Sequence, residues 1–312
     1  MPGAYAHITL VNELKEPQRL EAVPRFPAEA ISALLDYFKF CELGAVSPDY
    51  PYLAIGDGDA KKWADIMHYT QTGHVIQAGV KRLQSLGGET QRKCLAWLMG
   101  YTAHVTTDMT IHPVVELKVG SYQGHEKAHR ICEMHQDAYI FQRLNLGEVG
   151  VSEHLDSGIA TCRDSADPDL LDRDIVFLWM GMMQDVHPDE FVNNRPDIDK
   201  WHWGFKFVIG KIAEEGDRLF PLARHVAVGE GLTYPPKEDV DQQYITGLAI
   251  PGGKRMDYDA IFADAIRNVA GIWQVVASGA MQGRQTYLSK IGNWNLDTGR
   301  DESMRLVFWG MA

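Results

Sequence analysis

The chain has 312 residues, 45% hydrophobic and 23% charged, which is ordinary for a soluble globular protein. Its formal net charge of -12 argues against a general binder of nucleic acid or anionic membrane, because no basic stripe is available to neutralise phosphates. The four cysteines, Cys41, Cys94, Cys132 and Cys162, are widely spaced and predict free thiols. No secretory signal is recognisable, and the longest apolar run, Ile175–Met183, is too short to span a bilayer. We therefore expect a cytoplasmic protein, or a secreted one if a leader has been trimmed.

Helical patterning dominates the chain. The expected helices are, in order, Pro27–Leu43, Asp59–Leu86, Gln91 to about Thr110, Gln123–Leu146, Asp169–Gln184, Lys200–His225 and Asp257–Met281. Strand signals are few, because Ile8–Val11 is too short to found a sheet and Tyr244–Ile250 is a weak candidate. Tyr234–Gln243 is the best candidate loop, and no repeat or linker divides the chain. We predict one all-α domain over residues 1–312, with its chemistry mainly in residues 1–140.

The chemistry-bearing residues concentrate in two of these helices. Two trios, each spaced by four residues, can each line one helix face: His104, Asp108 and His112, then His125, His129 and Glu133. Two such trios within a short stretch predict two helices that face each other across a polar site.

The residue types in the trios favour a metal over a solvated helix face. Apolar residues surround His104 and Asp108, so both are expected to be buried, where an unpaired carboxylate is costly. A divalent cation satisfies carboxylate and imidazole together, and zinc accepts both ligand types. A hydrogen-bonded His–Asp core network is the alternative interpretation.

Three polar residues earlier in the chain extend the candidate set. His7 precedes an apolar run, Asp49 lies in the loop GAVSPDYPYL, and His68 lies in the helical segment WADIMHY. Each alone favours a structural role, such as a turn cap for Asp49 or a core histidine for His68. With the trios they make nine candidate ligands, enough for two or three metal ions.

The order of these motifs resembles the zinc-dependent phospholipase C family. The resemblance rests on His7, on SPDY with Asp49, on His68, on His104-x3-Asp108-x3-His112-Pro and on His129-x3-Glu133. The catalytic domain of the glycosylphosphatidylinositol phospholipase D is similar, and the single-strand-specific zinc nucleases are more distantly so. The resemblance covers roughly residues 1 to 140, with an echo in the segment NWNLD near residue 295.

The resemblance implies an all-α fold with a cleft that holds two to three zinc ions. Carried over, one zinc takes Asp49, His68, His104 and Asp108; a second takes His112, His129 and Glu133; a third takes His7, with Asp108 as a bridge. Secreted members also use the amino group of a processed N-terminal tryptophan, which does not precede His7 here. His125 has no family counterpart and is expected beside the ligands or facing the substrate.

The function expected from this cluster is phosphodiester hydrolysis by metal-activated water, with Asp49 as the base or water-orienting residue. The substrate is a phosphodiester, with a phospholipid headgroup as the leading candidate, and Tyr5, Tyr50, Tyr52, Tyr69 and Tyr122 are candidate pocket walls. Three alternatives stay open: a nuclease or nucleotidase on the same fold, a di-iron carboxylate bundle, and a non-catalytic protein stabilised by zinc. No stable nucleic-acid partner is expected, and the oligomeric state is left open.

Overall fold

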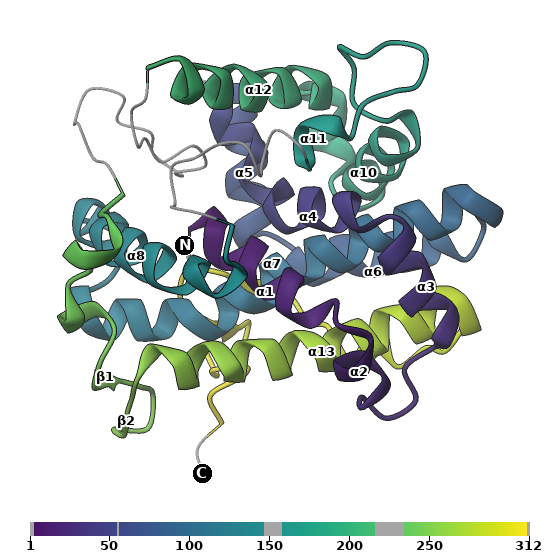
Figure 1. Ribbon diagram of the computed structural model, residues 1–312. Helices are drawn as coiled ribbons and strands as arrows, with labels where there is room; N and C mark the ends of the chain where they lie inside the picture. The colour runs from purple at the N-terminus through teal and green to yellow at the C-terminus, as the bar shows by residue number, and fades with distance from the viewer. Residues whose placement is uncertain (1–2, 55, 147–157, 216–233, 311–312) are drawn as a thin grey trace.

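The computed structural model describes residues 3–54, 56–146, 158–215 and 234–310 (Figure 1). Its α-helices are α1 (Ala4–Leu14), α2 (Pro17–Glu21), α3 (Ala28–Asp36), α4 (Phe38–Val46), α5 (Gly58–Tyr69), α6 (Thr72–Leu83), α7 (Gly88–Val119), α8 (Glu126–Phe141), α10 (Arg173–Val186), α11 (Pro188–Asn193), α12 (Ile198–Glu215), α13 (Tyr258–Gln282) and α14 (Tyr287–Lys290). The short 3-10 helices are η1 (Ser47–Leu53), η2 (Gln142–Leu144), η3 (Ile159–Thr161), η4 (Lys237–Asp239) and η5 (Gln242–Tyr244). The expected all-α class is confirmed.

Strands in the described residues are confined to two small antiparallel hairpins. β1 (Leu248–Ala249), which lies within the weak strand candidate Tyr244–Ile250, pairs with β2 (Arg255–Met256), which lies beyond it. β3 (Trp294–Asn295) pairs with β4 (Arg300–Asp301), with Trp294 opposite Asp301. Neither hairpin is long enough to form a layer, so helix packing builds the core.

Helix α7 is the central element of the fold. Every residue from Cys94 to Val115 is buried, so this stretch is covered on all sides. Figure 1 shows α7 crossing the middle of the molecule, with α13 running beneath it. A helix that is apolar around its circumference needs such a buried position. The polar residues within this stretch are therefore forced into the interior.

Two glycines let α4 approach α7 at backbone distance. A Cβ placed on Gly44 would lie 2.1 Å from the carbonyl oxygen of Trp97, and one on Gly100 would lie 1.9 Å from that of Cys41. No larger residue fits at either position without separating the helices. The close contact brings the end of α4 and the following η1 beside the polar stretch of α7.

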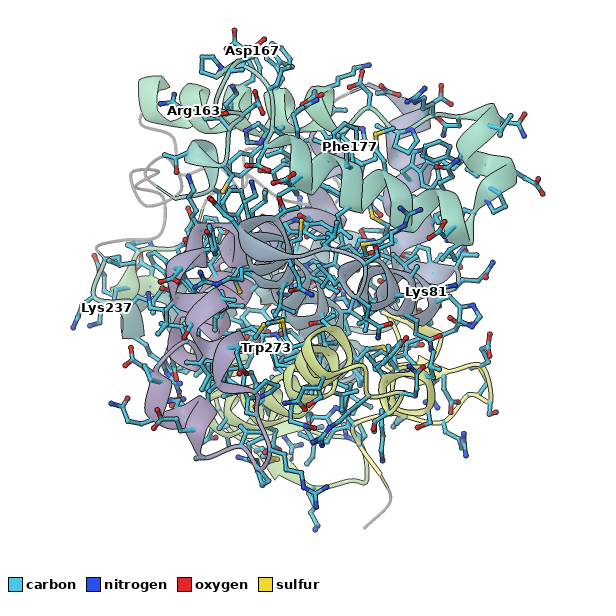
Figure 2. The ribbon with its side chains drawn as sticks, turned by 90° about the vertical axis from the view of Figure 1, so that its right-hand side faces the viewer. Lys81, Arg163, Asp167, Phe177, Lys237 and Trp273 are labelled. Atoms are coloured by element: carbon cyan, nitrogen blue, oxygen red, sulfur yellow. The ribbon has the colours of Figure 1, made fainter. Side chains whose placement is uncertain are left out.

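Helix α13 has the length and composition of a membrane-spanning helix, but the core helix of a soluble protein can meet the same criteria. Here Phe262, Val269 and Trp273 are buried, and the Trp273 indole donates a hydrogen bond of 2.6 Å to the Met99 carbonyl on α7. Figure 2 labels Trp273 of this helix together with Lys81 and Lys237, two charged residues that lie at the periphery of the molecule and are exposed. The packing of α13 is that of a core helix.

Some helix boundaries differ from those expected. Pro27–Leu43 forms two helices, α3 and α4, and Asp59–Leu86 is divided into α5 and α6, where Gln71 takes a left-handed backbone with φ of 51°. Ile8–Val11, considered as a short strand, lies inside helix α1. The part of Lys200–His225 beyond residue 215 lies outside the described residues. The four cysteines are free, as predicted, and all four are buried.

Candidate metal centre

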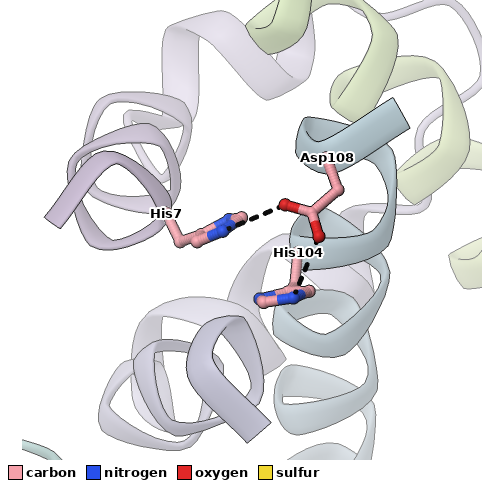
Figure 3. A group of neighbouring side chains, drawn as sticks. All are labelled: His7, His104 and Asp108. Carbon is pink, nitrogen blue, oxygen red and sulfur yellow. Dashed lines mark ion pairs between the residues drawn. The ribbon is translucent and has the colours of Figure 1, made fainter. Parts of the chain in front are cut away.

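Four elements bring the first candidate ligands together. His7 comes from α1, Asp49 from η1, His68 from the last turn of α5, and His104 and Asp108 from α7. In one group, ligand atoms of His7, His104 and Asp108 all lie within 4.8 Å of one another; in a second group, so do those of Asp49, His68 and His104. Figure 3 shows His7 and His104 directed at the Asp108 carboxylate.

The spacing of the facing atoms suits a metal site. His7 Nε2 lies 3.3 Å from Asp108 Oδ1, and His104 Nε2 lies 3.4 Å from Asp108 Oδ2. His68 Nε2 lies 3.4 Å from Asp49 Oδ1. Zinc bonds nitrogen and oxygen at about 2.0–2.1 Å, so two ligand atoms of a tetrahedral site lie about 3.3–3.4 Å apart. The observed separations match this distance between two zinc ligands, and they are long for charge-assisted hydrogen bonds.

The converging atoms are buried and have no hydrogen-bond partner. Among the candidate ligands in the described part of the chain, the atoms of this kind are His7 Nδ1 and Nε2, Asp49 Oδ1, His68 Nε2, His104 Nε2, Asp108 Oδ1 and Oδ2, His112 Nε2, and His129 Nδ1. Leaving a buried polar atom unpaired costs free energy, and native proteins seldom do so. Divalent cations would satisfy these atoms, so the residues fit zinc better than a hydrogen-bonded core network.

Backbone carbonyls orient three of the histidines. His68 Nδ1 donates to the Ala64 carbonyl at 2.6 Å and His104 Nδ1 to the Ala45 carbonyl at 2.9 Å, while His112 Nδ1 donates to the Leu296 carbonyl. A carbonyl only accepts, so each Nδ1 carries a proton, and in the neutral ring the lone pair is then on Nε2. This is the arrangement in which imidazole binds metal.

The charge balance supports the same picture. Burial opposes ionisation of Asp108, but the neighbouring His104, His112 and His7 outweigh it and hold the pKa of Asp108 well below its usual value. Burial and the stacked His104 ring, 4.1 Å away between centroids, lower the pKa of His7. Burial is also the main cause that lowers the pKa of His112 to about 4. Burial opposes protonation of His104, but the neighbouring Asp108 and Asp49 outweigh it and raise the pKa of that imidazole. The site therefore combines an ionised carboxylate with two histidines, His7 and His112, whose neutral form is favoured, and these are the ligand forms that metal needs.

The second trio is only partly assembled. His129 Nδ1 lies 3.8 Å from Glu133 Oε1, and its Nε2 donates to the Gly120 carbonyl at 2.6 Å. His112 and Glu133 are close enough to interact electrostatically. His125 is exposed at the start of α8, where its Nδ1 contacts the Ser121 carbonyl at 2.9 Å, so it stands apart from the two compact groups.

The sequence reasoning missed one buried carboxylate. Asp137 follows Glu133 by one helical turn and accepts hydrogen bonds from the backbone N–H groups of Tyr5 and Ala6, at 3.3 and 3.0 Å, and from the Tyr234 hydroxyl at 3.0 Å. It thereby holds the first turn of α1, which carries His7. The continued four-residue spacing after His129 and Glu133 was the available signal.

Comparison with known protein families identifies one that matches the chain. The family model described as zinc dependent phospholipase C matches residues 6–189, which is more than half of the chain. The chain belongs to this family. The matched range contains all eight residues expected to bind zinc and ends before α12. No curated protein and no solved structure matches the chain significantly.

Proposed function

We propose that this family member hydrolyses phosphodiesters of the phospholipid-headgroup type at a centre of two to three zinc ions. The observation that carries the proposal is the Asp108 carboxylate, which is fully buried and directs one oxygen toward His7 and the other toward His104. A carboxylate presented to two histidines on different helices is suited to bridge two cations.

The hydrogen bonds restrict how the ligands divide among the ions. His104 uses Nδ1 for the Ala45 carbonyl, so only its Nε2 is free and it can serve one ion. We therefore assign Asp49, His68, His104 and Asp108 to one zinc, and His7 with the second oxygen of Asp108 to another. His112, His129 and Glu133 are the candidates for the remaining ion.

When bound, zinc supplies Lewis acidity to the phosphodiester and makes water nucleophilic near neutral pH. Asp49 is also the residue proposed to orient that water or take its proton, through the carboxylate oxygen that does not bind zinc, because the carboxylate is buried beside the ligand group, with Oδ1 3.4 Å from His68 Nε2. Burial of the site excludes bulk water and strengthens every electrostatic contact within it.

Of the five candidate tyrosines, Tyr52 and Tyr69 donate their hydroxyls to Asp65 and Asp297, and the other three differ in burial. Tyr5 and Tyr50 are buried and pack against other aromatic rings, Phe141 for Tyr5 and Phe205 for Tyr50, and so belong to the core. Tyr122 is half-buried, with its ring 5.3 Å from that of His129. It is the tyrosine best placed to contact a headgroup beside the second trio.

The test is hydrolysis by the zinc-loaded protein of a chromogenic choline phosphodiester, phosphatidylcholine vesicles and single-stranded DNA. We expect activity on the first two that is lost on chelation, restored by zinc and lost in Asp49→Asn. The exposed His74 is the matched control, and His74→Ala should retain activity. Cleavage of DNA alone would replace the proposal with the nuclease alternative. Inactivity on all three substrates, with zinc bound, would favour a non-catalytic zinc protein.

A further inference from the structure

One residue near the end of the chain contacts two of the ligand-bearing elements. Leu296, fully buried, donates its backbone N–H to the His68 carbonyl at 3.1 Å and offers its own carbonyl to His112 Nδ1. It follows β3 directly, in the hairpin Trp294–Asp301, which we call the C-terminal hairpin. This hairpin lies more than one hundred residues beyond the end of the family match.

The C-terminal hairpin is fastened to α6 by a two-way hydrogen bond. Thr72 Oγ1 accepts from the Trp294 N–H at 2.8 Å and donates to the Trp294 carbonyl at 2.9 Å. Thr72 is fully buried, so these bonds are shielded from water. They set the position of β3, and Leu296 is only two residues further along the chain.

The hairpin is also fitted against the α7 turn that follows His112. Pro113 lacks an N–H, so the Met109 carbonyl loses its usual helical partner. Gly299, with φ of 66°, packs against Pro113 and the Met109 carbonyl. A Cβ on Gly299 would lie 2.4 Å from Pro113 Cγ and 2.7 Å from the Met109 oxygen. Only glycine satisfies both the backbone conformation and the close approach.

The contact to His112 has a direct chemical consequence. Its Nε2 has lone-pair character only while the proton resides on Nδ1, and the Leu296 carbonyl is what holds the proton there. Partners of this kind fix both tautomer and ring orientation of a metal-binding histidine, and their loss typically weakens metal binding about 10–100-fold.

We propose that the C-terminal hairpin is an integral part of the metal centre, with Leu296 as the positioning residue for His112 and His68. The site is then completed only when a segment outside the matched family region closes onto α5 and α7. This inference rests on the zinc centre of the proposed function, but not on the reaction or substrate assigned to it.

The experiment compares variants of the full chain by zinc affinity, measured in competition with a chromogenic chelator. Thr72→Val keeps the side-chain shape but removes both bonds to Trp294, and we expect zinc affinity to fall about 10–100-fold. Thr72→Ser keeps the hydroxyl and should bind zinc nearly as wild type does. Gln77→Leu is the matched control, because Gln77 Nε2 donates at 2.7 Å to the Ile291 carbonyl, which precedes the hairpin.

Two further measurements separate positioning from a general loss of folding. Gly299→Ala, which forces the hairpin away from Pro113, should weaken zinc binding with a normal helical circular dichroism spectrum. In zinc-free, histidine-labelled protein, 15N shifts should show the Nδ1–H tautomer of His112 in the wild type and mixed tautomers in Thr72→Val. Wild-type zinc affinity in both Thr72→Val and Gly299→Ala would overturn the proposal. Because zinc binding is measured, that outcome is distinct from inactivity of the zinc-loaded wild type, which would refute only the proposed function.

Discussion

Asp108→Asn is the most informative single substitution in the metal centre. The variant keeps the volume of the side chain and removes its charge at a fully buried position between His7 and His104. Asparagine also presents an amide nitrogen, which does not bind zinc, in place of one of the two oxygens. The bridge proposed between two cations would therefore be lost without creating a cavity.

The size of the effect follows from electrostatics. Two unit charges about 4 Å apart interact by about 4 kcal/mol at an effective dielectric constant of about 20, and two divalent zinc ions repel roughly four times as strongly, so about 4 kcal/mol is a lower bound. Removing the carboxylate leaves two cations facing each other without the anion between them. A loss of about 4 kcal/mol corresponds to about a thousandfold, at about 1.36 kcal/mol per factor of ten. We expect loss of at least one zinc and a fall in phosphodiesterase activity of about a thousandfold or more.

The assay pairs elemental analysis of dialysed protein with turnover of a chromogenic choline phosphodiester. His74→Ala serves again as the control, since the His74 side chain is exposed and its Nδ1 contacts Gln71 at 3.2 Å, away from the ligand groups. Full zinc occupancy with near-normal turnover in Asp108→Asn would refute the bridging role. Loss of zinc in the control would show that the readout reports general instability.

Four other substitutions test separate parts of the structure. His104→Ala removes the imidazole common to both ligand groups and should lower zinc content and the melting temperature in excess zinc; unchanged values would exclude it as a ligand. His129→Ala should lower zinc content and the exposed His125→Ala should not, and the opposite result would make His125 the ligand of α8. Burial raises the pKa of Asp137 to about 7, although the Tyr234 hydroxyl and two backbone N–H groups partly offset it. The folded protein then holds a proton between about pH 4 and 7 that the unfolded chain releases, so the free energy of unfolding should fall as pH rises through this range. In zinc-free protein, Asp137→Asn should flatten that slope by up to one proton, or about 1.4 kcal/mol per pH unit; identical urea-unfolding profiles for both proteins from pH 5 to 8 would contradict this.

Local spacing explains why much of the site was predictable. His104 and Asp108 are four residues apart on a helix, so their side chains meet whatever surrounds them, and the 3.4 Å contact follows from helix geometry. Burial of both was predictable from their apolar neighbours, and it is complete. The family resemblance seen in the motif order is confirmed by the match over residues 6–189.

Two predictions of secondary structure were wrong, one at the boundary between α5 and α6 and one in the N-terminal helix. The left-handed conformation of Gln71 separates α5 from α6, although the apolar pattern continues across it. At the N-terminus, the apolar run at Ile8 reads equally as strand or helix, because a helix buried all round loses its amphipathic period. The sequence pattern alone could not resolve either case.

The sequence by itself determined the all-α class, the family and the ligand types, because each depends on residue chemistry repeated at short, regular spacing. Only the tertiary structure decided which distant residues complete the site. The pairing of His7 with Asp108, the Asp137 anchor for α1 and the Leu296 carbonyl at His112 join positions 101, 131 and 184 residues apart. Such contacts leave no periodic signal in the sequence, since they are set by helix packing, including the glycine-mediated approach of α4 to α7 and the seat of Gly299 against Pro113.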